Sequence, residues 1–369
     1  MISIVVPTLG RPSLAALLAA LGPLPPDVEL IVVDDRPAPH PPLALSSRVV
    51  AGPARGPAAA RNAGVRASRG DWIAFLDDDV LPDSDWIIRL RGDLEAAGPE
   101  VGGVQGSLRV PVPSDRRPTD WERVTAALAD GAWITADMAY RRAALTQAGG
   151  FDERLPRAFR EDADLAFRVR RDGWTLVRGH RTVTHPVRPE SPWVSVRTQR
   201  GNADDALLRR LYGPEWRSKL EIPPGRRSRH AAIAAAGAVA LAATAALVAT
   251  RRVSPGASRG ASHIVSAVRR LSPGVSSGAA RRVSPGVSRG RGVLSAAAIV
   301  GGLVWGAGTA EFAAARIAPG PRTPREVGTM VVTSAVIPPV AVGHWLRGAW
   351  RWRKAEPLVG AAVPVGAGR

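Results

Sequence analysis

The sequence predicts an α/β domain with a mostly parallel sheet covered by helices, followed by an α-helical membrane region. Three observations lead to this fold class. Short continuous apolar runs alternate with Ala- and Leu-rich segments in the first 222 residues, which is typical of buried parallel strands joined by helices. Acidic side chains directly follow two of these runs. After Pro223 the composition changes to long uncharged runs separated by arginine-rich segments.

Apolar runs and turn residues divide the start of the domain into elements. Apolar runs of about five residues without alternation predict buried strands. Pro12 is tolerated in a first helical turn and opens an Ala- and Leu-rich helix. In chain order we expect a strand at 2–6, a helix from 12 to about 21, a strand at 29–35, a helix at 56–67, a strand at 72–76 and a helix near 85–97 capped by Asp83 or Ser84.

The formal net charge of +18 is unevenly distributed along the chain. Residues 1–222 hold 30 Lys and Arg against 29 Asp and Glu, whereas residues 223–369 hold 20 against 3. The positive excess therefore belongs to the part that also holds the long apolar runs. This combination suits an anionic membrane surface better than DNA, so no specific nucleic-acid partner is expected.

The cysteine content and the N-terminus restrict the compartment. The chain has no cysteine, which excludes a disulfide framework and a thiolate metal site. Met1 leads straight into an apolar run, without a basic segment or a small-residue cleavage site. We therefore expect no signal peptide and a first domain that faces the cytoplasm. No obligate protein partner is indicated.

The most informative stretch is the run of three aspartates at 77–79, which follows the predicted strand at 72–76. Adjacent carboxylates repel one another unless a cation neutralises them. Oxygen ligands favour Mg²⁺ or Mn²⁺, which commonly join protein carboxylates to substrate phosphates. An acidic surface turn is the alternative. Ligands of parallel sheets bind at the carboxyl ends of the strands, where Thr8, Asp34 and Asp35 also fall.

Six short motifs occur along the first domain in a fixed order. They are VVPT at 5–8, VVDD at 32–35, ARNAG at 60–64, FLDDD at 75–79, GGFDE at 149–153 and EDADL at 161–165. Each motif alone has little specificity, but their joint order and spacing are specific. On these motifs the chain resembles the family 2 glycosyltransferases over roughly residues 1–215. The resemblance implies a GT-A fold, a nucleotide-diphosphate sugar donor, a divalent metal ion (Mn²⁺ or Mg²⁺) and inversion at the anomeric carbon.

The resemblance assigns donor-side roles to residues at the strand ends. Asp35, and with it Asp34, can accept a hydrogen bond from a pyrimidine N–H, although a turn or N-cap role would also explain an aspartate there. Thr8 and the preceding Pro7 would line the same nucleotide pocket. Arg61 would bind a phosphate or ribose, with an exposed helical arginine as the alternative.

The same resemblance implies a metal site built on the aspartate run. Asp79, the last acid of the DxD element, is the first candidate ligand. Asp77 and Asp78 would assist through metal, water or ribose contacts. His185 occupies the place where several family members carry a late histidine near the metal or the diphosphate. An ordinary loop histidine is the alternative.

Residues after the aspartate run are candidates for the acceptor side. Residues 133–142 resemble the family segment that usually reads G-N-M-A-F-R-R, and Trp133 and Asp137 lie within it. Ala136-Asp137 replaces Gly-Asn, so the family's Asn contact does not carry over directly. Asp137 could meet an acceptor hydroxyl or could hold a neighbouring arginine.

Inverting transfer needs one carboxylate that removes the proton of the acceptor hydroxyl. By resemblance this base is Asp162, supported by Glu161 and Asp164. Acids at a helix start also complement the helix dipole, which is the structural alternative. One base suffices because the leaving diphosphate is neutralised by metal rather than protonated. The Q-x-x-R-W signature of processive synthases does not occur in the chain, which favours transfer of a single sugar.

The C-terminal part holds three long apolar runs, at 231–250, 293–310 and 327–346. About 20 residues at ~1.5 Å each suffice to cross a hydrocarbon core of ~30 Å. The first run is mostly alanine, so a buried soluble helix is its alternative, and Pro338-Pro339 interrupts the third. Between the first two runs, a segment that begins R-R-x-S-P-G recurs from 251, 269 and 281, which predicts a disordered linker.

The arginine-rich repeat leaves three topologies open. If the first run spans, the repeat lies outside, against the positive-inside tendency. If only the second and third runs span, the repeat and the basic end both stay inside. A hairpin of the first two runs with the third in the interface is the remaining option. We expect two or more spans, and these domains: 1–222 catalytic, 223–250 basic stretch and first apolar helix, 251–292 linker, 293–354 membrane-associated helices and 355–369 tail.

Together these observations predict a metal-dependent inverting glycosyltransferase at the cell membrane, with its catalytic domain in the cytoplasm. It would move one sugar from a nucleotide-diphosphate sugar to a membrane lipid or lipid-linked acceptor, such as a polyprenyl-linked or cell-envelope glycan. A nucleotidyltransferase acting on sugar phosphates is one alternative, but it would want a lysine near the phosphates, and Lys219 is the only lysine of the first domain. A basic membrane tether that binds nucleic acid through the repeats is the non-enzymatic alternative.

Overall fold

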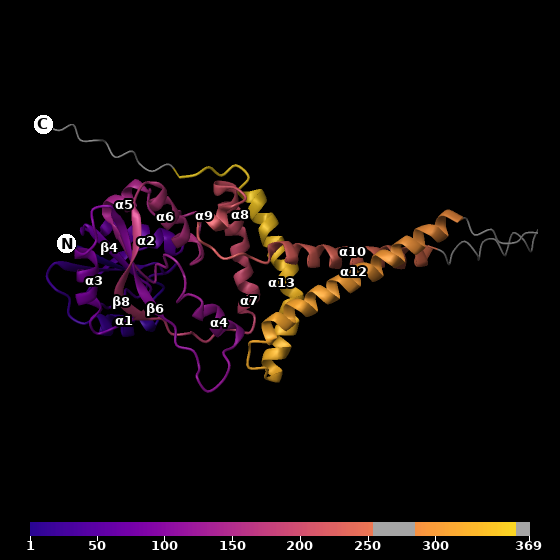
Figure 1. Ribbon diagram of the computed structural model, residues 1–369, viewed down its shortest axis with the longest axis horizontal. Helices are drawn as coiled ribbons and strands as arrows, with labels where there is room; N and C mark the ends of the chain where they lie inside the picture. Colours follow the sequence, from indigo (N-terminus) through magenta and orange to yellow (C-terminus); the bar gives the residue numbers. More distant parts are fainter. Residues whose placement is uncertain (254–284, 359–369) are drawn as a thin grey trace, which may run out of the picture. The chain divides into compact units, whose positions relative to one another are not determined.

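The computed structural model describes residues 1–253 and 285–358, and the chain divides into two compact units (Figure 1). The first unit comprises Met1–Gly225, Pro319–Glu326 and Gly343–Arg369. The second comprises Arg226–Ala318 and Val327–Val342. The first boundary lies close to the predicted end of the catalytic domain at residue 222, whereas the return of two C-terminal segments to the first unit was not predicted.

The first unit is built on an eight-stranded sheet with the order β3-β2-β1-β4-β7-β6-β8-β5. The four strands β3, β2, β1 and β4 are parallel neighbours, and β7 runs antiparallel between β4 and β6. The predicted α/β class with a mostly parallel sheet is confirmed. The strands are β1 Ile2–Thr8, β2 Val28–Asp34, β3 Arg48–Ala51, β4 Trp72–Leu76, β5 Leu81–Pro82, β6 Val101–Arg109, β7 Asp137–Arg141 and β8 Thr175–Thr184.

Helices cover both faces of this sheet (Figure 1). Alternate residues of a strand point to opposite faces, and Ile4 accordingly packs in a cluster with Leu17 and Leu90, while Val5 packs with Ala60 and Leu165 on the other face. The helices of this unit are α1 Ser13–Leu21, α2 Pro57–Ala67, α3 Trp86–Glu95, α4 Asp120–Ala126, α5 Arg142–Gln147, α6 Glu161–Arg171, α7 Val194–Arg197, the 3-10 helix η1 Thr198–Gly201, α8 Asn202–Tyr212 and α9 Trp216–Lys219.

The elements predicted for the first 100 residues are found with small shifts at their ends. The predicted cap of α3 is wrong, because Asp85 stands at the N-cap position without a side-chain cap. The Asp83 carboxylate instead pairs with Arg109 on β6. Strands β6 and β8 were not predicted, because their sequences VGGVQGSLR and TLVRGHRTVT mix apolar residues with Gly, Gln and Arg.

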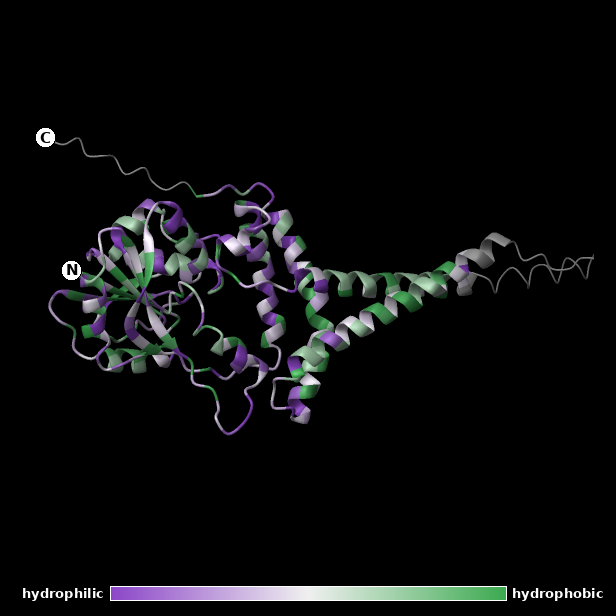
Figure 2. Ribbon diagram, in the orientation of Figure 1, coloured by the Kyte–Doolittle hydropathy of each residue, from purple (hydrophilic) through white to green (hydrophobic). Residues whose placement is uncertain are grey.

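The second unit contains long apolar helices, which Figure 2 shows as mainly hydrophobic. Helices α10 (Arg227–Val253) and α12 (Pro285–Ile317) pack so closely that a Cβ added at Gly301 would lie 2.8 Å from the Ala236 carbonyl oxygen. Helix α13 covers Pro324–Arg351. By length and composition, segments Arg227–Thr250, Gly290–Ile317 and Pro324–Arg351 could each cross a membrane.

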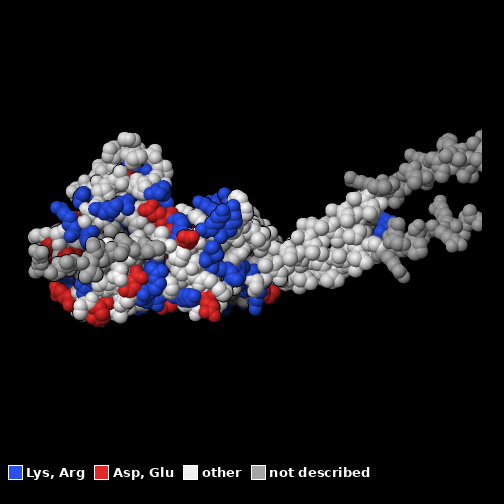
Figure 3. All heavy atoms as spheres, turned by 90° about the horizontal axis from the view of Figure 1, so that it is seen from above, with Lys and Arg blue, Asp and Glu red and all other residues white. Residues whose placement is uncertain are grey.

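Described helices reach into both ends of the segment 251–292, which was predicted to be a disordered linker. Residues 251–253 end α10, and α12 begins at Pro285, a residue that suits a first helical turn. Most of the R-R-x-S-P-G repeat, at residues 254–284, lies outside the described part of the chain. On the face shown in Figure 3, positive and negative side chains are interspersed over the first unit, and the helix pair is almost free of both.

Candidate active site

The carboxyl ends of three neighbouring strands bring the predicted donor-side residues to one edge of the sheet. Thr8, the last residue of β1, lies opposite Asp34 of β2. Strand β4, on the other side of β1, ends one residue before Asp77. Pro7 precedes Thr8 within β1 and is partly buried. Neighbouring parallel strands end at the same edge, so these side chains meet although they are far apart in sequence.

Asp78 joins two of these strand ends. Thr8 Oγ1 donates a hydrogen bond of 2.6 Å to one of its carboxylate oxygens, and Arg11 Nη1 lies 2.7 Å from the other. The Asp78 side chain is buried. These contacts connect the end of β1 to the aspartate run. Asp78 therefore orders the site.

Asp34 and Asp35 hold the neighbouring loops. Arg36 reaches both oxygens of Asp34, at 2.8 and 2.6 Å, and these hydrogen bonds lower the pKa of Asp34. Asp35 accepts hydrogen bonds from the backbone amides of Ala54 and Gly56, at 2.6 and 3.1 Å, yet burial raises its pKa. Both carboxylates therefore hold neighbouring backbone at this edge of the sheet.

Arg61 connects the aspartate run to the start of helix α6. Its Nη2 lies 2.7 Å from Asp77 Oδ1, and its Nη1 lies 2.8 Å from Glu161 Oε1. The side chain is only 2% exposed, and both carboxylates raise the pKa of Arg61 against the opposing effect of burial. A buried guanidinium shared by two carboxylates is a positioning element, which differs from the phosphate or ribose contact expected from sequence.

Asp79 lies next to His185 and Arg188. Its carboxylate oxygens are 3.7 Å from His185 Nε2 and 3.0 Å from Arg188 Nε. Burial is the first cause that raises the pKa of Asp79, and the nearby Asp77 carboxylate is the second. Within residues 1–253 and 285–358, no group of three or more His, Asp and Glu side chains is arranged to hold an ion alone.

These residues nevertheless fit a Mg²⁺ or Mn²⁺ site that is completed by substrate. An oxygen donor and an imidazole converge at Asp79 and His185, and Asp77 adds negative charge beside them. Mg²⁺ is usually held by one or two carboxylates together with substrate phosphates and water. These side chains would therefore need further ligands, such as phosphate oxygens and water, to hold such an ion.

Asp162 and Glu161 occupy the first turn of α6 but have different surroundings. Asp162 Oδ1 accepts a hydrogen bond of 2.7 Å from the Ala163 amide, while Oδ2 has no hydrogen-bond partner among the described residues. Both oxygens of Glu161 are engaged, by Arg61 and by the Phe159 amide. Burial raises the pKa of both carboxyls, and for Glu161 burial and the adjacent Asp162 raise it to about 7.

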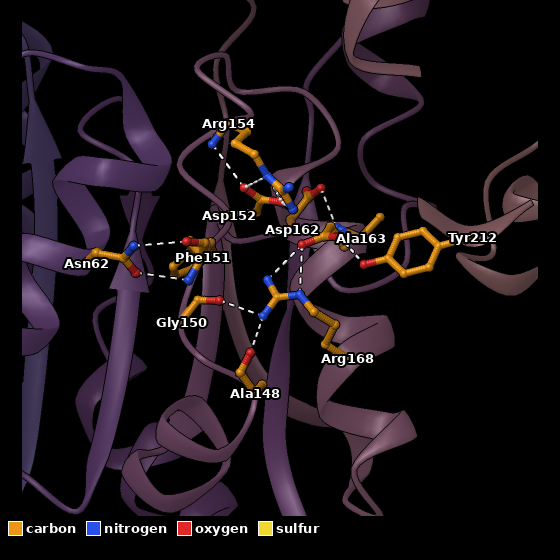
Figure 4. Close-up of polar contacts among 11 residues, drawn as sticks. Asn62, Ala148, Gly150, Phe151, Asp152, Arg154, Asp162, Ala163, Arg168 and Tyr212 are labelled. Carbon is orange, nitrogen blue, oxygen red and sulfur yellow. Dashed lines mark hydrogen bonds and ion pairs between the residues drawn. The ribbon is translucent and has the colours of Figure 1, made fainter. Parts of the chain in front are cut away.

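Figure 4 shows further contacts that hold α6 in place. Arg168 donates two hydrogen bonds, of 3.0 and 2.7 Å, to Asp164 Oδ2 and also reaches the carbonyls of Ala148 and Gly150. Tyr212 of α8 donates to the other oxygen of Asp164 at 2.5 Å. Asp164 is fully buried. The turn that carries Asp162 is thus held between α8 and the loop that precedes α6.

The predicted acceptor-side residues have other contacts. Asp137 is buried and accepts hydrogen bonds from Arg181 Nε at 2.7 Å and from the Trp86 indole at 2.8 Å. These contacts correspond to the alternative in which it holds a neighbouring arginine. Trp133 has a φ of 63°, and its indole donates to Glu221 at 2.8 Å. Trp133 lies in the partly buried shell of the core that contains Tyr140.

Sequence reasoning missed several polar residues of this region. Arg11 and Arg188 bind the aspartate run, and Tyr212 binds α6. The Tyr140 hydroxyl is buried without a hydrogen-bond partner among the described residues, and Asp162 contributes to its raised pKa. The available signal for Arg188 was its position three residues after His185. Arg11 and Tyr212 had no such signal in the sequence, because their partners are 48 or more residues away.

Comparison with known proteins finds relatives that are similar to the first part of the chain. Residues 3–130 match the family model described as Glycosyl transferase family 2. The pre-mycofactocin glycosyltransferase of Mycobacterium tuberculosis is 31% identical over 128 residues, which are 31% of this chain and 26% of that protein. The succinoglycan biosynthesis protein ExoO of Rhizobium meliloti is 40% identical over 81 residues, which are 20% and 23%. The chain therefore spans about a quarter of the length of these curated relatives.

Solved structures match a larger share of the chain, with low TM-scores. Glucosyl-3-phosphoglycerate synthase from M. tuberculosis, in complex with Mn²⁺, UDP-glucose and phosphoglyceric acid, has a TM-score of 0.42 at 22% identity, covering 61% of this chain and 81% of its own. S. aureus TarS 1-349 in complex with UDP has a TM-score of 0.39 at 16% identity, covering 59% and 69%.

The contacts of Asp137 predict a large loss of stability when it is removed. Asp137→Ala leaves the buried Arg181 without one of its carboxylates, and breaking a buried ion pair costs about 3–5 kcal/mol in the free energy of unfolding. Asp130→Ala, at an exposed aspartate, is the matched control and should change it by less than about 0.5 kcal/mol. Urea unfolding measures both. A stable Asp137→Ala variant that has lost only acceptor binding would contradict this structural role.

The raised pKa of Glu161 predicts a pH-dependent stability. The folded state keeps the proton up to a pKa of about 7, whereas the unfolded chain releases it near the ordinary glutamate pKa of 4.5. The folded state therefore binds more protons in this window, so the free energy of unfolding should fall as pH rises through it. In urea unfolding at pH 5 and pH 8, Glu161→Gln should show a smaller fall than the wild type. An equal fall in both proteins would rule out Glu161 as the source.

Proposed function

We propose that this chain, whose first domain is a glycosyl transferase family 2 domain, moves a sugar from a nucleotide-diphosphate sugar to an acceptor hydroxyl. One observation carries the proposal: Arg61 binds Asp77 of the aspartate run and Glu161 beside Asp162 at the same time. The donor-side and acceptor-side carboxylates thus belong to one connected site. The match of residues 3–130 to the family and a relative named as a glycosyltransferase support the same activity.

Asp162 is the residue best suited to act as the base. An acceptor hydroxyl needs a carboxylate oxygen that is free to accept its proton. Asp162 Oδ2 has no hydrogen-bond partner among the described residues, whereas both oxygens of Glu161 are engaged. Burial raises the pKa of Asp162, which makes it a stronger base than an exposed aspartate. Attack on C1 from the side opposite the diphosphate inverts the anomeric centre.

Asp79, Asp77 and His185 would hold a Mg²⁺ or Mn²⁺ ion on the donor side. Such an ion neutralises the charge that develops on the leaving diphosphate. The residues themselves order this edge, because Arg188 holds one oxygen of Asp79 and Arg61 holds Asp77. Thr8, Asp34 and Asp35 shape the adjacent loops, where the base and ribose of the nucleotide would lie.

The acceptor is proposed to be at the membrane. Three helices are long and apolar enough to cross a bilayer, which supports a membrane-anchored enzyme acting on a lipid or a lipid-linked glycan. A catalytic unit on the cytoplasmic side would meet nucleotide sugars, which fits the expected orientation. The missing Q-x-x-R-W motif favours transfer of a single sugar.

The proposal is tested with a panel of nucleotide sugars and Mn²⁺ or Mg²⁺, using the full-length protein and a lipid extract as acceptor. Asp162→Asn should lower kcat by about 10²–10⁴-fold, since it removes the base, and should leave donor binding intact. Asp172→Asn, at the other end of α6, is the matched control and should keep the wild-type rate. Equal turnover of Asp162→Asn and wild type would remove the base assignment. Formation of a nucleotide sugar from a sugar phosphate would favour a nucleotidyltransferase instead.

A further inference from the structure

The C-terminal end of α13 belongs to the first unit and docks on α8. Residues from Gly343 onward are part of that unit, although most of α13 is not. At Gly348 an added Cβ would lie 2.6 Å from both the Cα and the carbonyl oxygen of Ala203, the second residue of α8. The two backbones therefore approach as closely as a glycine allows.

Residues after Gly348 extend this contact. Trp352 and Ala355, which follow Gly348 by four and seven residues, pack against the buried cluster that contains Ala163 and Leu207. Ala163 is the neighbour of Asp162, and Leu207 lies in α8. The segment thus touches the hydrophobic core on which the base-bearing turn rests.

A backbone contact anchors the segment next to the loop before α6. Arg154 Nη1 donates a hydrogen bond of 2.8 Å to the Glu356 carbonyl, while its other nitrogens bind the buried Asp152. Figure 4 shows the contact of Arg154 with Asp152. Glu356 is therefore fixed by an arginine that also orders the loop before α6.

Helix α8 in turn holds the turn that carries the base. Its Asp204 binds Arg157 Nη1 with both oxygens at 2.8 Å, and its Asp205 binds Arg160 at 3.0 Å. Arg160 directly precedes Glu161 and has a φ of 79°, a conformation that a non-glycine residue keeps only when its surroundings impose it. The bond from Tyr212 to Asp164, one turn further on, completes this support. Displacing α8 would therefore displace the start of α6.

We propose that the face carrying Gly348, Trp352 and Ala355 is a positioning element that sets the place of Asp162 through α8. This inference rests on the proposed function for its effect on rate, but the docking itself does not. The C-terminal segment is then an integral part of the catalytic domain as well as the end of an apolar helix. A tight approach is sensitive to small changes, since an added methyl group at Gly348 has to push α8 aside.

The test compares two glycines of α13 in the full-length protein. In a helix, Ala in place of Gly is normally stabilising, so Gly348→Ala isolates the clash with Ala203, and Gly343→Ala, where a Cβ meets nothing within 4 Å, is the matched control. Gly348→Ala should lower kcat about tenfold, because small misplacements of a catalytic group are costly, with the donor KM unchanged. Gly343→Ala should keep both constants. Trp352→Ala and the 70% exposed Trp350→Ala form a second pair with the same expectation.

Hydrogen exchange gives a readout that does not depend on activity. Amides at 157–166 should exchange faster in Gly348→Ala and Trp352→Ala than in the wild type, and at the wild-type rate in the two controls. If the wild type transfers no sugar, the proposed function fails, and the exchange data still decide the docking. If the wild type is active while Gly348→Ala and Trp352→Ala match it in kcat, KM and exchange, the positioning role is contradicted.

Discussion

The site depends on one buried guanidinium, that of Arg61. It lies between Asp77, at the end of β4, and Glu161, at the start of α6, which are carboxylates of two elements that are distant in sequence. Without this cation, Asp77, Glu161 and Asp162 would place several negative charges in a partly dehydrated region, where their repulsion would tend to open the site. Arg61 offsets part of this repulsion and holds Asp77 and Glu161 near each other. Its Nε has no partner among the described residues, so the arrangement is not optimised for stability alone.

Charge neutralisation around Arg61 also explains how the carboxylates divide their tasks. Asp78 and Glu161 have both oxygens engaged in protein contacts, whereas Asp162 keeps one oxygen without a partner in the described structure. Asp79 is held beside His185 and Arg188 with a raised pKa, a state that a metal ion would relieve. We therefore expect the chemistry at the carboxylates whose negative charge is least compensated by protein contacts.

Sequence patterns predicted those features that depend on local composition. Continuous apolar runs such as WIAFL at 72–76 indicated buried strands, and the aspartates after them indicated the sheet edge, because both signals lie within a few residues. The role of Arg61 was not predictable in this way, since one of its partners is 100 residues away and its burial depends on packing. Asp137 was ambiguous for the same reason, because Arg181 reaches it across the sheet. Neither segment has a sequence pattern that indicates the close approach of Gly348 to Ala203.

The steady-state kinetics of Arg61→Lys test most directly whether Arg61 positions the site. Lysine keeps the positive charge but lacks the planar fork that reaches Asp77 and Glu161 together. If Arg61 positions the site, kcat should fall by at least about tenfold with little change in the donor KM. If it instead binds the nucleotide, the donor KM should rise while kcat is retained. Wild-type kcat in Arg61→Lys would contradict the account, since the connected site would then not depend on this guanidinium.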